Sequence, residues 1–107
     1  MTSKARFALV YAPETIDHMA AIERKYHRLI RHTLKEHLCF TPGAETRNRK
    51  PLEPPALLGA IWELRLGPNN RFRVFYSINE TEHIVEILAI GIKEGDRMTV
   101  AGEEWNL

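Results

Sequence analysis

The chain has 107 residues, of which 44% are hydrophobic and 27% charged, and its formal net charge is +1. This length suits one domain with one core, so we expect a single domain over residues 1–107. No stretch reaches the roughly 18 apolar residues of a membrane span, and the apolar run before Pro13 is too short for a signal peptide. The single cysteine, Cys39, cannot form an internal disulfide. These features indicate a cytoplasmic protein that does not enter a membrane.

The charges are unevenly distributed along the chain. Residues 24–50 hold eight of the 15 lysines and arginines but only two acids, Glu36 and Glu45. The acids gather instead between Glu80 and Glu104, near the end of the chain. The net charge alone therefore does not indicate a nucleic-acid partner, but the basic middle stretch is compatible with one.

The first part of the chain changes from a strand pattern to a helix pattern. Residues 6–11 (RFALVY) are dense in β-forming side chains and predict a strand that ends at Pro13. From there to about Leu38, apolar side chains recur every three or four residues, which predicts one helical face. Neither proline nor glycine interrupts residues 14–41. The pattern fits one long helix and equally two helices with a tight break, ended by Thr41–Gly43.

The second half of the chain predicts strands. The segment from Pro42 to Gly59 has four prolines and is expected to hold little regular structure beyond a turn. Residues 61–66 and 72–78 alternate between apolar and polar side chains. Residues 84–92 are apolar on both faces, as a central strand would be.

The end of the chain completes the expected fold. A short edge strand is expected at Met98–Val100, and Trp105 is expected to pack back onto the fold. The sequence thus predicts an α+β fold, in which an antiparallel sheet of about four strands has the N-terminal helical segment packed on one face.

The hairpin between residues 61–66 and 72–78 has a predictable register. A loop of five residues, 67–71, aligns the apolar side chains of both strands in the pairs Leu66–Phe72, Leu64–Val74 and Trp62–Tyr76. A loop of four residues would set Leu64 opposite Arg73, because a slip of one residue turns every side chain to the other face. The longer loop also sets Arg65 opposite Arg73 on the face away from the helical segment. Two like charges there indicate either a well-solvated surface or a site that awaits an anion.

Basic side chains form the main candidate site. They are Arg47, Arg49 and Lys50 on the proline-rich segment, Arg65 and Arg73 on the sheet, and Lys93 after the third long strand. Guanidinium groups fork onto phosphate oxygens, and Phe75 is placed on the same face to stack on a base. The alternative is a solvated sheet face that Glu63 and Glu86 neutralise.

Other chemistry has less support in the sequence. In the predicted helical segment, His27, His32 and His37 step by five residues and do not share one face, and no Cys or His pair has zinc spacing. We therefore expect no metal site and no cofactor. Glu63 or Glu86 is able to act as a base toward a ribose hydroxyl, or else pairs with Arg65 and Arg73. No glycine-rich phosphate loop, nucleophile elbow or internal repeat is present.

Three segments carry a resemblance to a known superfamily. They are ETRNRKPL (45–52), WELRLGPNNRFRVFY (62–76) and VEILAIGIKEGDRM (85–98). With the order of strand, helical segment, cationic loop and three antiparallel strands, they resemble the RelE/ParE toxin superfamily over nearly the whole chain. The resemblance implies the toxin of a bacterial type II toxin–antitoxin pair, of the plasmid-stabilisation kind. RelE-like members cut mRNA in the ribosomal A site, ParE-like members inhibit DNA gyrase, and a cognate antitoxin neutralises the toxin.

The resemblance also implies roles for single side chains. Arg73 matches the arginine that binds phosphate in RelE-like toxins, Lys93 stands where they place a second arginine, and Arg65 matches a further basic position. Where RelE has two lysines, this chain has Ile61 and Glu63, and no tyrosine follows Lys93 to match the family's C-terminal one.

The expected function is that of a toxin acting as a ribosome-dependent mRNA endonuclease or translation inhibitor. The 2′-hydroxyl of RNA would attack its own phosphate, Arg73 and Arg65 would stabilise the phosphate charge, and Lys93 would assist. The arm at residues 47–50 would hold the RNA backbone in place of the absent lysines. The alternatives are a non-enzymatic ParE-like inhibitor of a protein target such as DNA gyrase, and a catalytically inactive module that only binds a partner.

Overall fold

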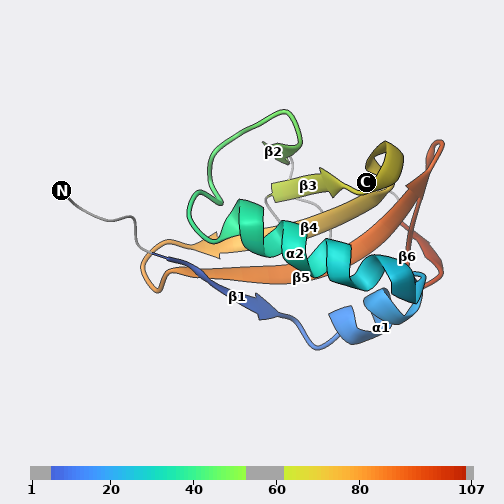
Figure 1. Cartoon of the computed structure of the whole chain (residues 1–107), viewed down its shortest axis with the longest axis horizontal. Helices are drawn as coiled ribbons and strands as arrows, with labels where there is room; N and C mark the ends of the chain where they lie inside the picture. Colours follow the sequence, from blue (N-terminus) through green and yellow to red (C-terminus); the bar gives the residue numbers. More distant parts are fainter. Residues whose placement is uncertain (1–5, 53–61, 106–107) are drawn as a thin grey trace.

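Two helices pack across one face of an open, seven-stranded sheet, which makes this an α+β fold (Figure 1). The computed structural model describes residues 6–52 and 62–105. The helices are α1 (Thr15–Ala20) and α2 (His27–Leu38). The strands are β1 (Ala8–Tyr11), β2 (Arg49–Pro51), β3 (Trp62–Leu66), β4 (Phe72–Asn79), β5 (Ile84–Glu94), β6 (Arg97–Val100) and β7 (Glu103–Trp105).

The sheet is antiparallel except at β1. Its strands follow the order β2-β3-β4-β5-β6-β7, and β1 pairs in parallel with β5. β4 lies along one edge of β5, while β1 and β6 occupy the two ends of the other edge, which confirms β5 as a central strand. The expectation of about four strands was too low. β2 and β7 have three residues each, too few to show an alternating pattern, and they form by pairing with β3 and β6.

The helical region consists of two helices rather than one. α1 ends after Ala20, and Glu23 has an extended backbone (φ −53°, ψ 133°) that breaks the helix. A short 3₁₀ turn at Arg24–Tyr26 then leads into α2. A ring nitrogen of His27 lies 2.8 Å from the carbonyl oxygen of Ile22 and ties the break together. The spacing of apolar residues allowed one long helix or two helices, and the structure has two.

The proline-rich segment is more regular than the sequence predicted. The prediction of little structure beyond a turn was wrong for Arg49–Pro51, which form β2 on the edge of β3. Pro51 is tolerated there because an edge strand needs hydrogen bonds on one side only. The backbones of Thr46 and Arg49 exchange two hydrogen bonds, of 2.9 and 3.3 Å, just before β2. Residues 53–61, including Ile61, lie outside the described part of the chain.

The predicted register of the β3–β4 hairpin is confirmed. Leu64 pairs with Val74, and Arg65 lies opposite Arg73, as the five-residue loop requires. Gly67 opens this loop at φ 83°, in the left-handed region, and a side chain there would collide with the ring of Phe72. The glycine and the alternating pattern together decide which side chains of the hairpin face the helices.

The main core lies between the helices and the sheet. α2 lies across β3, β4 and β5 (Figure 1). Apolar side chains of α2 pack against the helix-facing side chains of these strands. Its fully buried members include Ile30, Leu34, Leu38, Leu64, Phe72, Val74, Tyr76, Val85 and Ile87. His18 of α1 is also buried, and its Nδ1 accepts a hydrogen bond of 3.3 Å from the backbone N–H of Ile90. No helix within residues 6–52 and 62–105 is long and apolar enough to cross a membrane.

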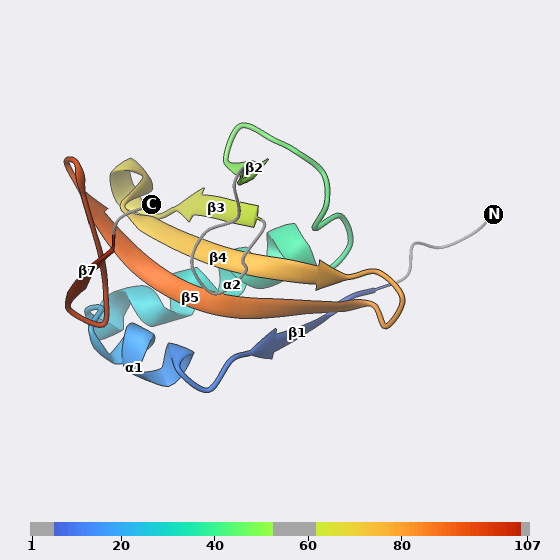
Figure 2. The same cartoon turned by 180° about the vertical axis from the view of Figure 1, so that it is seen from behind.

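A smaller apolar cluster lies on the other face of the sheet. It consists of Phe75, Ala89, Met98 and Val100, with Trp105 packed against it. The rings of Phe75 and Trp105 are 6.0 Å apart between centroids, which confirms that Trp105 packs back onto the fold. The hairpin of β6 and β7 thereby covers part of a face that the helices do not reach (Figure 2).

Candidate functional site

A cavity of about 450 Å³ opens on the side of the sheet opposite the helices. Figure 2 looks onto this side, across β3, β4 and β5. The polar side chains that line the cavity are Lys50, Glu63, Arg65, Arg73, Lys93 and Asp96, and the apolar ones are Leu52, Met98 and Trp105. Four of the basic side chains singled out from the sequence therefore meet in one place, although they come from four different strands.

Strand pairing explains why these side chains gather. Arg65 lies directly opposite Arg73, and Lys50 lies opposite Glu63, so alternation turns all four toward the same side. Lys93 reaches this side from the far end of β5. The cavity thus depends on the pairing of β2 with β3, because this pairing places Lys50 in its lining.

Arg73 is the most constrained cation of the cavity. Its Nη1 lies 3.4 Å from Glu63 Oε2, and its Nε donates a hydrogen bond of 3.1 Å to the carbonyl oxygen of Asn70. The Arg73 side chain is 14% exposed and that of Glu63 only 5%, so solvent screens this ion pair weakly. Glu63 therefore fixes the direction of the guanidinium and neutralises part of its charge.

The other three cations of the cavity are not neutralised in this way. Lys50, Arg65 and Lys93 form no ion pair with any acid in residues 6–52 and 62–105. Among the described residues, four cations and two acids, Glu63 and Asp96, line the cavity, so these walls carry an excess of positive charge. Such a concave basic surface attracts phosphate and other anions.

Arg49 does not belong to this cavity, contrary to the expectation of a common arm with Arg47 and Lys50. Alternation in β2 turns it toward the helices, where it is 5% exposed. Its Nη1 donates a hydrogen bond of 2.8 Å to the carbonyl oxygen of His37 and another to that of Thr41. The guanidinium of Arg49 therefore binds the end of α2 and does not face the cavity. Arg47 is exposed and lies in the turn before β2, outside the lining of the cavity.

Phe75 is on the predicted side of the sheet but is not accessible. It is 1% exposed, because the β6–β7 hairpin lays Trp105 against it. A base cannot stack on Phe75 in this arrangement. Trp105 is half-buried and lines the cavity itself, so it is the aromatic ring that a ligand would meet. Trp105 and Asp96 were not among the predicted site residues, since their approach depends on the two turns that close the last strands.

The two candidate carboxylates of the sequence are separated by the structure. Glu63 pairs with Arg73 inside the cavity, which confirms one predicted ion pair. Glu86 is exposed, lies opposite Ser77 near the other end of β5, and pairs with no basic side chain of the described residues. Of these two carboxylates, Glu63 is thus the one placed at the cavity, where it can act as a base.

In the described part of the chain, no three His, Cys, Asp or Glu side chains gather in a way that could hold a metal ion. Comparison of the chain with models of protein families and with curated proteins gives no match.

Proposed function

We propose that the chain is a RelE/ParE-like toxin of a type II toxin–antitoxin pair, and that its basic cavity binds and cleaves mRNA on the ribosome. The observation that carries the proposal is the meeting of Lys50, Arg65, Arg73 and Lys93 around one cavity. The sequence resemblance implies a phosphate contact for Arg73 and further basic positions at Lys93 and Arg65, and Lys50 is added from the cationic segment. A volume of about 450 Å³ suits a small bound group such as a nucleotide.

The proposed reaction is an internal transfer of phosphate. The ribose 2′-oxygen attacks the adjacent phosphorus, the bond from phosphorus to the 5′-oxygen breaks, and a 2′,3′-cyclic phosphate and a 5′-hydroxyl are formed. Glu63 takes the proton of the 2′-hydroxyl, and Arg73, 3.4 Å from Glu63, holds the phosphate beside it. Arg65 and Arg73 stabilise the extra negative charge of the transition state. Lys93 supports the charge that develops on the leaving 5′-oxygen, which takes a proton from water to become the 5′-hydroxyl.

Trp105 and Lys50 complete this arrangement. Trp105 offers an aromatic ring at the cavity on which a base can stack, in place of the covered Phe75. Lys50 holds the RNA backbone from the β2 side. A cognate antitoxin is the protein partner that this proposal implies.

The proposal is tested by expression of the protein in bacteria and by cleavage of mRNA on purified ribosomes. We expect wild type to arrest growth and to cut mRNA, and Arg73→Lys to cut about 10²–10³-fold more slowly, because lysine keeps the charge but not the fork. Arg73→Lys is preferred to Arg73→Ala, which would leave Glu63 buried without its cation.

Arg24→Ala is the matched control for this experiment. Arg24 is an exposed cation of the 3₁₀ turn and does not line the cavity. We expect it to cut like wild type. If folded Arg73→Lys cleaved mRNA as fast as wild type, Arg73 would have no part in the reaction. If wild type did not cleave mRNA, the proposed ribonuclease activity would be excluded.

One observation favours a second candidate, a non-enzymatic inhibitor of a protein target such as DNA gyrase. Glu63 stands where the resemblance would place a lysine, and it neutralises part of the charge of Arg73. A DNA supercoiling assay with purified gyrase separates the candidates. Growth arrest with intact mRNA and inhibited supercoiling would favour the inhibitor.

A further inference from the structure

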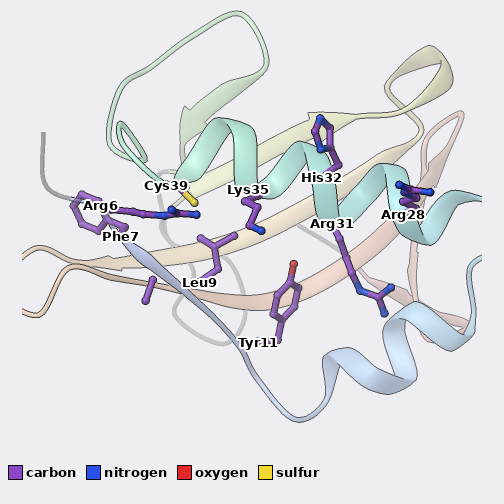
Figure 3. A pocket seen from close by; sticks show the side chains of 10 residues that line it. Arg6, Phe7, Leu9, Tyr11, Arg28, Arg31, His32, Lys35 and Cys39 are labelled. Atoms are coloured by element: carbon purple, nitrogen blue, oxygen red, sulfur yellow. The ribbon is translucent and has the colours of Figure 1, made fainter.

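A second and larger cavity lies on the helix side of the sheet. It has a volume of about 670 Å³ and forms a groove between α2 and β1 (Figure 3). In Figure 3, Arg31 and Lys35 reach from α2 toward β1, and the hydroxyl of Tyr11 points from β1 toward α2. The backbone N–H of Phe7 donates a hydrogen bond of 2.6 Å to the carbonyl oxygen of Cys39, which joins the two walls at one end.

The walls of the groove carry positive charge that no acid of the described residues neutralises. Within residues 6–52 and 62–105, no Asp or Glu lines the groove, whereas four cations do: Arg6, Arg28, Arg31 and Lys35. None of these cations forms an ion pair with a described carboxylate. Arg28, Arg31 and Lys35 follow one side of α2 over two turns, roughly 10 Å. A ligand with one negative charge would leave most of their repulsion in place, so a ligand with several is favoured.

The floor of the groove is apolar and includes an accessible aromatic ring. Phe7, Leu9 and Tyr11 supply its apolar surface. Phe7 is 7% exposed and Tyr11 is 37% exposed, so Tyr11 is the ring that a ligand would meet. Burial raises the pKa of the Tyr11 phenol, against the opposing effect of Arg31, so the hydroxyl stays neutral and able to donate a hydrogen bond. Such a ring suits the stacking of a planar base.

We propose that the groove binds a nucleoside polyphosphate, a small ligand that combines several negative charges with a planar base. Arg6, Arg31 and Lys35 hold the phosphates through charge-assisted hydrogen bonds. The base lies against Tyr11 and Leu9. A volume of about 670 Å³ lies within the usual range for small-molecule sites.

A small ligand fits this groove better than a nucleic-acid strand. The hydrogen bond from Phe7 to Cys39 ties the chain before β1 to the end of α2, so a long strand could not leave through this end. The inference does not depend on cleavage of RNA, because the groove and the basic cavity lie on opposite sides of the sheet.

The site is tested by calorimetric titration with ATP at about 0.15 M salt, with EDTA present to remove Mg²⁺. We expect wild type to bind ATP, and the Arg31→Gln, Lys35→Gln variant to bind it at least about tenfold more weakly, because two charged donors to phosphate are lost. Arg24→Gln, Lys25→Gln is the matched control, since it removes the same charge from exposed residues outside the groove. No binding by wild type, or equal binding by wild type and the groove variant, would overturn the proposal.

Lys50→Gln separates the groove from the basic cavity, which also attracts phosphate. If ATP occupies the groove, this variant should bind ATP as wild type does. A loss of ATP affinity as large as that of the groove variant would instead place ATP in the basic cavity, and the proposed groove site would be wrong.

The role of the aromatic ring is tested with ATP and inorganic tripolyphosphate side by side. Tyr11→Leu keeps an apolar side chain but removes the ring, so it should weaken ATP binding about tenfold and leave tripolyphosphate binding unchanged. Far-UV circular dichroism checks that the variant is folded. If wild type bound the two ligands with equal affinity, the groove would attract polyanions in general and a nucleotide site would be excluded.

Magnesium provides a last test. Mg²⁺ at nucleotide sites is usually held by one or two carboxylates together with the phosphates, and no carboxylate of the described residues lines the groove. Excess Mg²⁺ should therefore weaken ATP binding, because it neutralises the phosphate oxygens that the cations contact. A requirement for Mg²⁺ would contradict the proposal.

Discussion

At the scale of single residues, Glu63 has two possible uses that one substitution separates. It holds Arg73 through an ion pair of 3.4 Å, and it is the buried carboxylate of the cavity. Glu63→Gln removes a negative charge while keeping the size of the side chain. We expect the variant to bind RNA more tightly, because repulsion from phosphate is lost, and to cut it about 10²–10⁴-fold more slowly, because the base is lost.

Asp96→Asn is the control for this prediction. Asp96 also lines the cavity, so its removal should strengthen RNA binding in the same way without affecting proton transfer. Binding is measured by fluorescence anisotropy and cleavage on ribosomes. If Glu63→Gln cut as fast as wild type, Glu63 would serve only to position Arg73.

The burial of His18 leads us to predict that the stability of the protein depends on pH. Burial lowers the pKa of His18, against the opposing effect of Glu14 and Asp17, and its Nδ1 must stay unprotonated to accept from the N–H of Ile90. Between the lowered pKa of the folded chain and the ordinary value of the unfolded chain, the unfolded chain binds more protons. The free energy of unfolding should therefore fall as the pH drops below about 6.5.

The measurement is urea unfolding of wild type and His18→Asn between about pH 7.5 and pH 5. The Oδ1 atom of asparagine can accept from the N–H of Ile90 but does not titrate in this range. We expect the stability advantage of wild type over the variant to shrink as the pH falls. Parallel curves for the two proteins would show that His18 does not control the acid limb.

At the scale of elements, Arg49 connects α2 with β2. Its guanidinium donates to the carbonyl oxygens of His37 and Thr41 at the end of α2, while the next residue, Lys50, enters the basic cavity. A cation at a helix C-terminus is also favoured by the helix dipole. The hydrogen bonds of Arg49 hold β2 against the end of α2, and they thereby also position Lys50 on the opposite face of the sheet.

Arg49→Met should lower the free energy of unfolding by about 2–4 kcal/mol, since two carbonyl oxygens lose a charged donor in a buried place. Arg47→Met, an exposed arginine two residues earlier, should change it by less than about 0.5 kcal/mol. Urea unfolding measures both. A similar loss for the two variants would mean that Arg49 is not the connection between α2 and β2.

At the scale of the whole molecule, two basic surfaces lie on opposite sides of one sheet in a chain of net charge +1. Among residues 6–52 and 62–105, no Asp or Glu lines the cavity between α2 and β1, and Glu63 and Asp96 are the only acids that line the basic cavity. If RNA occupies the cavity alone, its salt dependence reports the cavity cations and not those of the groove.

We therefore expect the logarithm of RNA affinity to fall with the logarithm of salt concentration with a slope of about −2. This value corresponds to phosphate contacts with a single strand by the three cavity cations that have no ion pair, Lys50, Arg65 and Lys93. Lys50→Ala should reduce this slope by about 0.7, and Arg31→Ala in the groove should leave it unchanged. Anisotropy titrations at several salt concentrations measure the slope. Equal effects of the two variants would indicate that RNA spans both surfaces.

The sequence by itself determined the α+β class, the helix side of the sheet and the register of the β3–β4 hairpin. These follow from short-range patterns: the period of apolar residues along the helices and the alternation of apolar and polar residues in the strands. Because the register assigns each side chain to a face, it also places Arg65 opposite Arg73.

Only the tertiary structure decided which side chains the site contains. β2 and β7 are too short to show a pattern, and they exist because an edge of β3 and an edge of β6 were available for pairing. The first pairing turns Arg49 inward and Lys50 into the cavity, and the second covers Phe75 with Trp105. A local pattern tells which way a side chain faces within its own strand. What lies against that face depends on residues far along the chain, which no local pattern records.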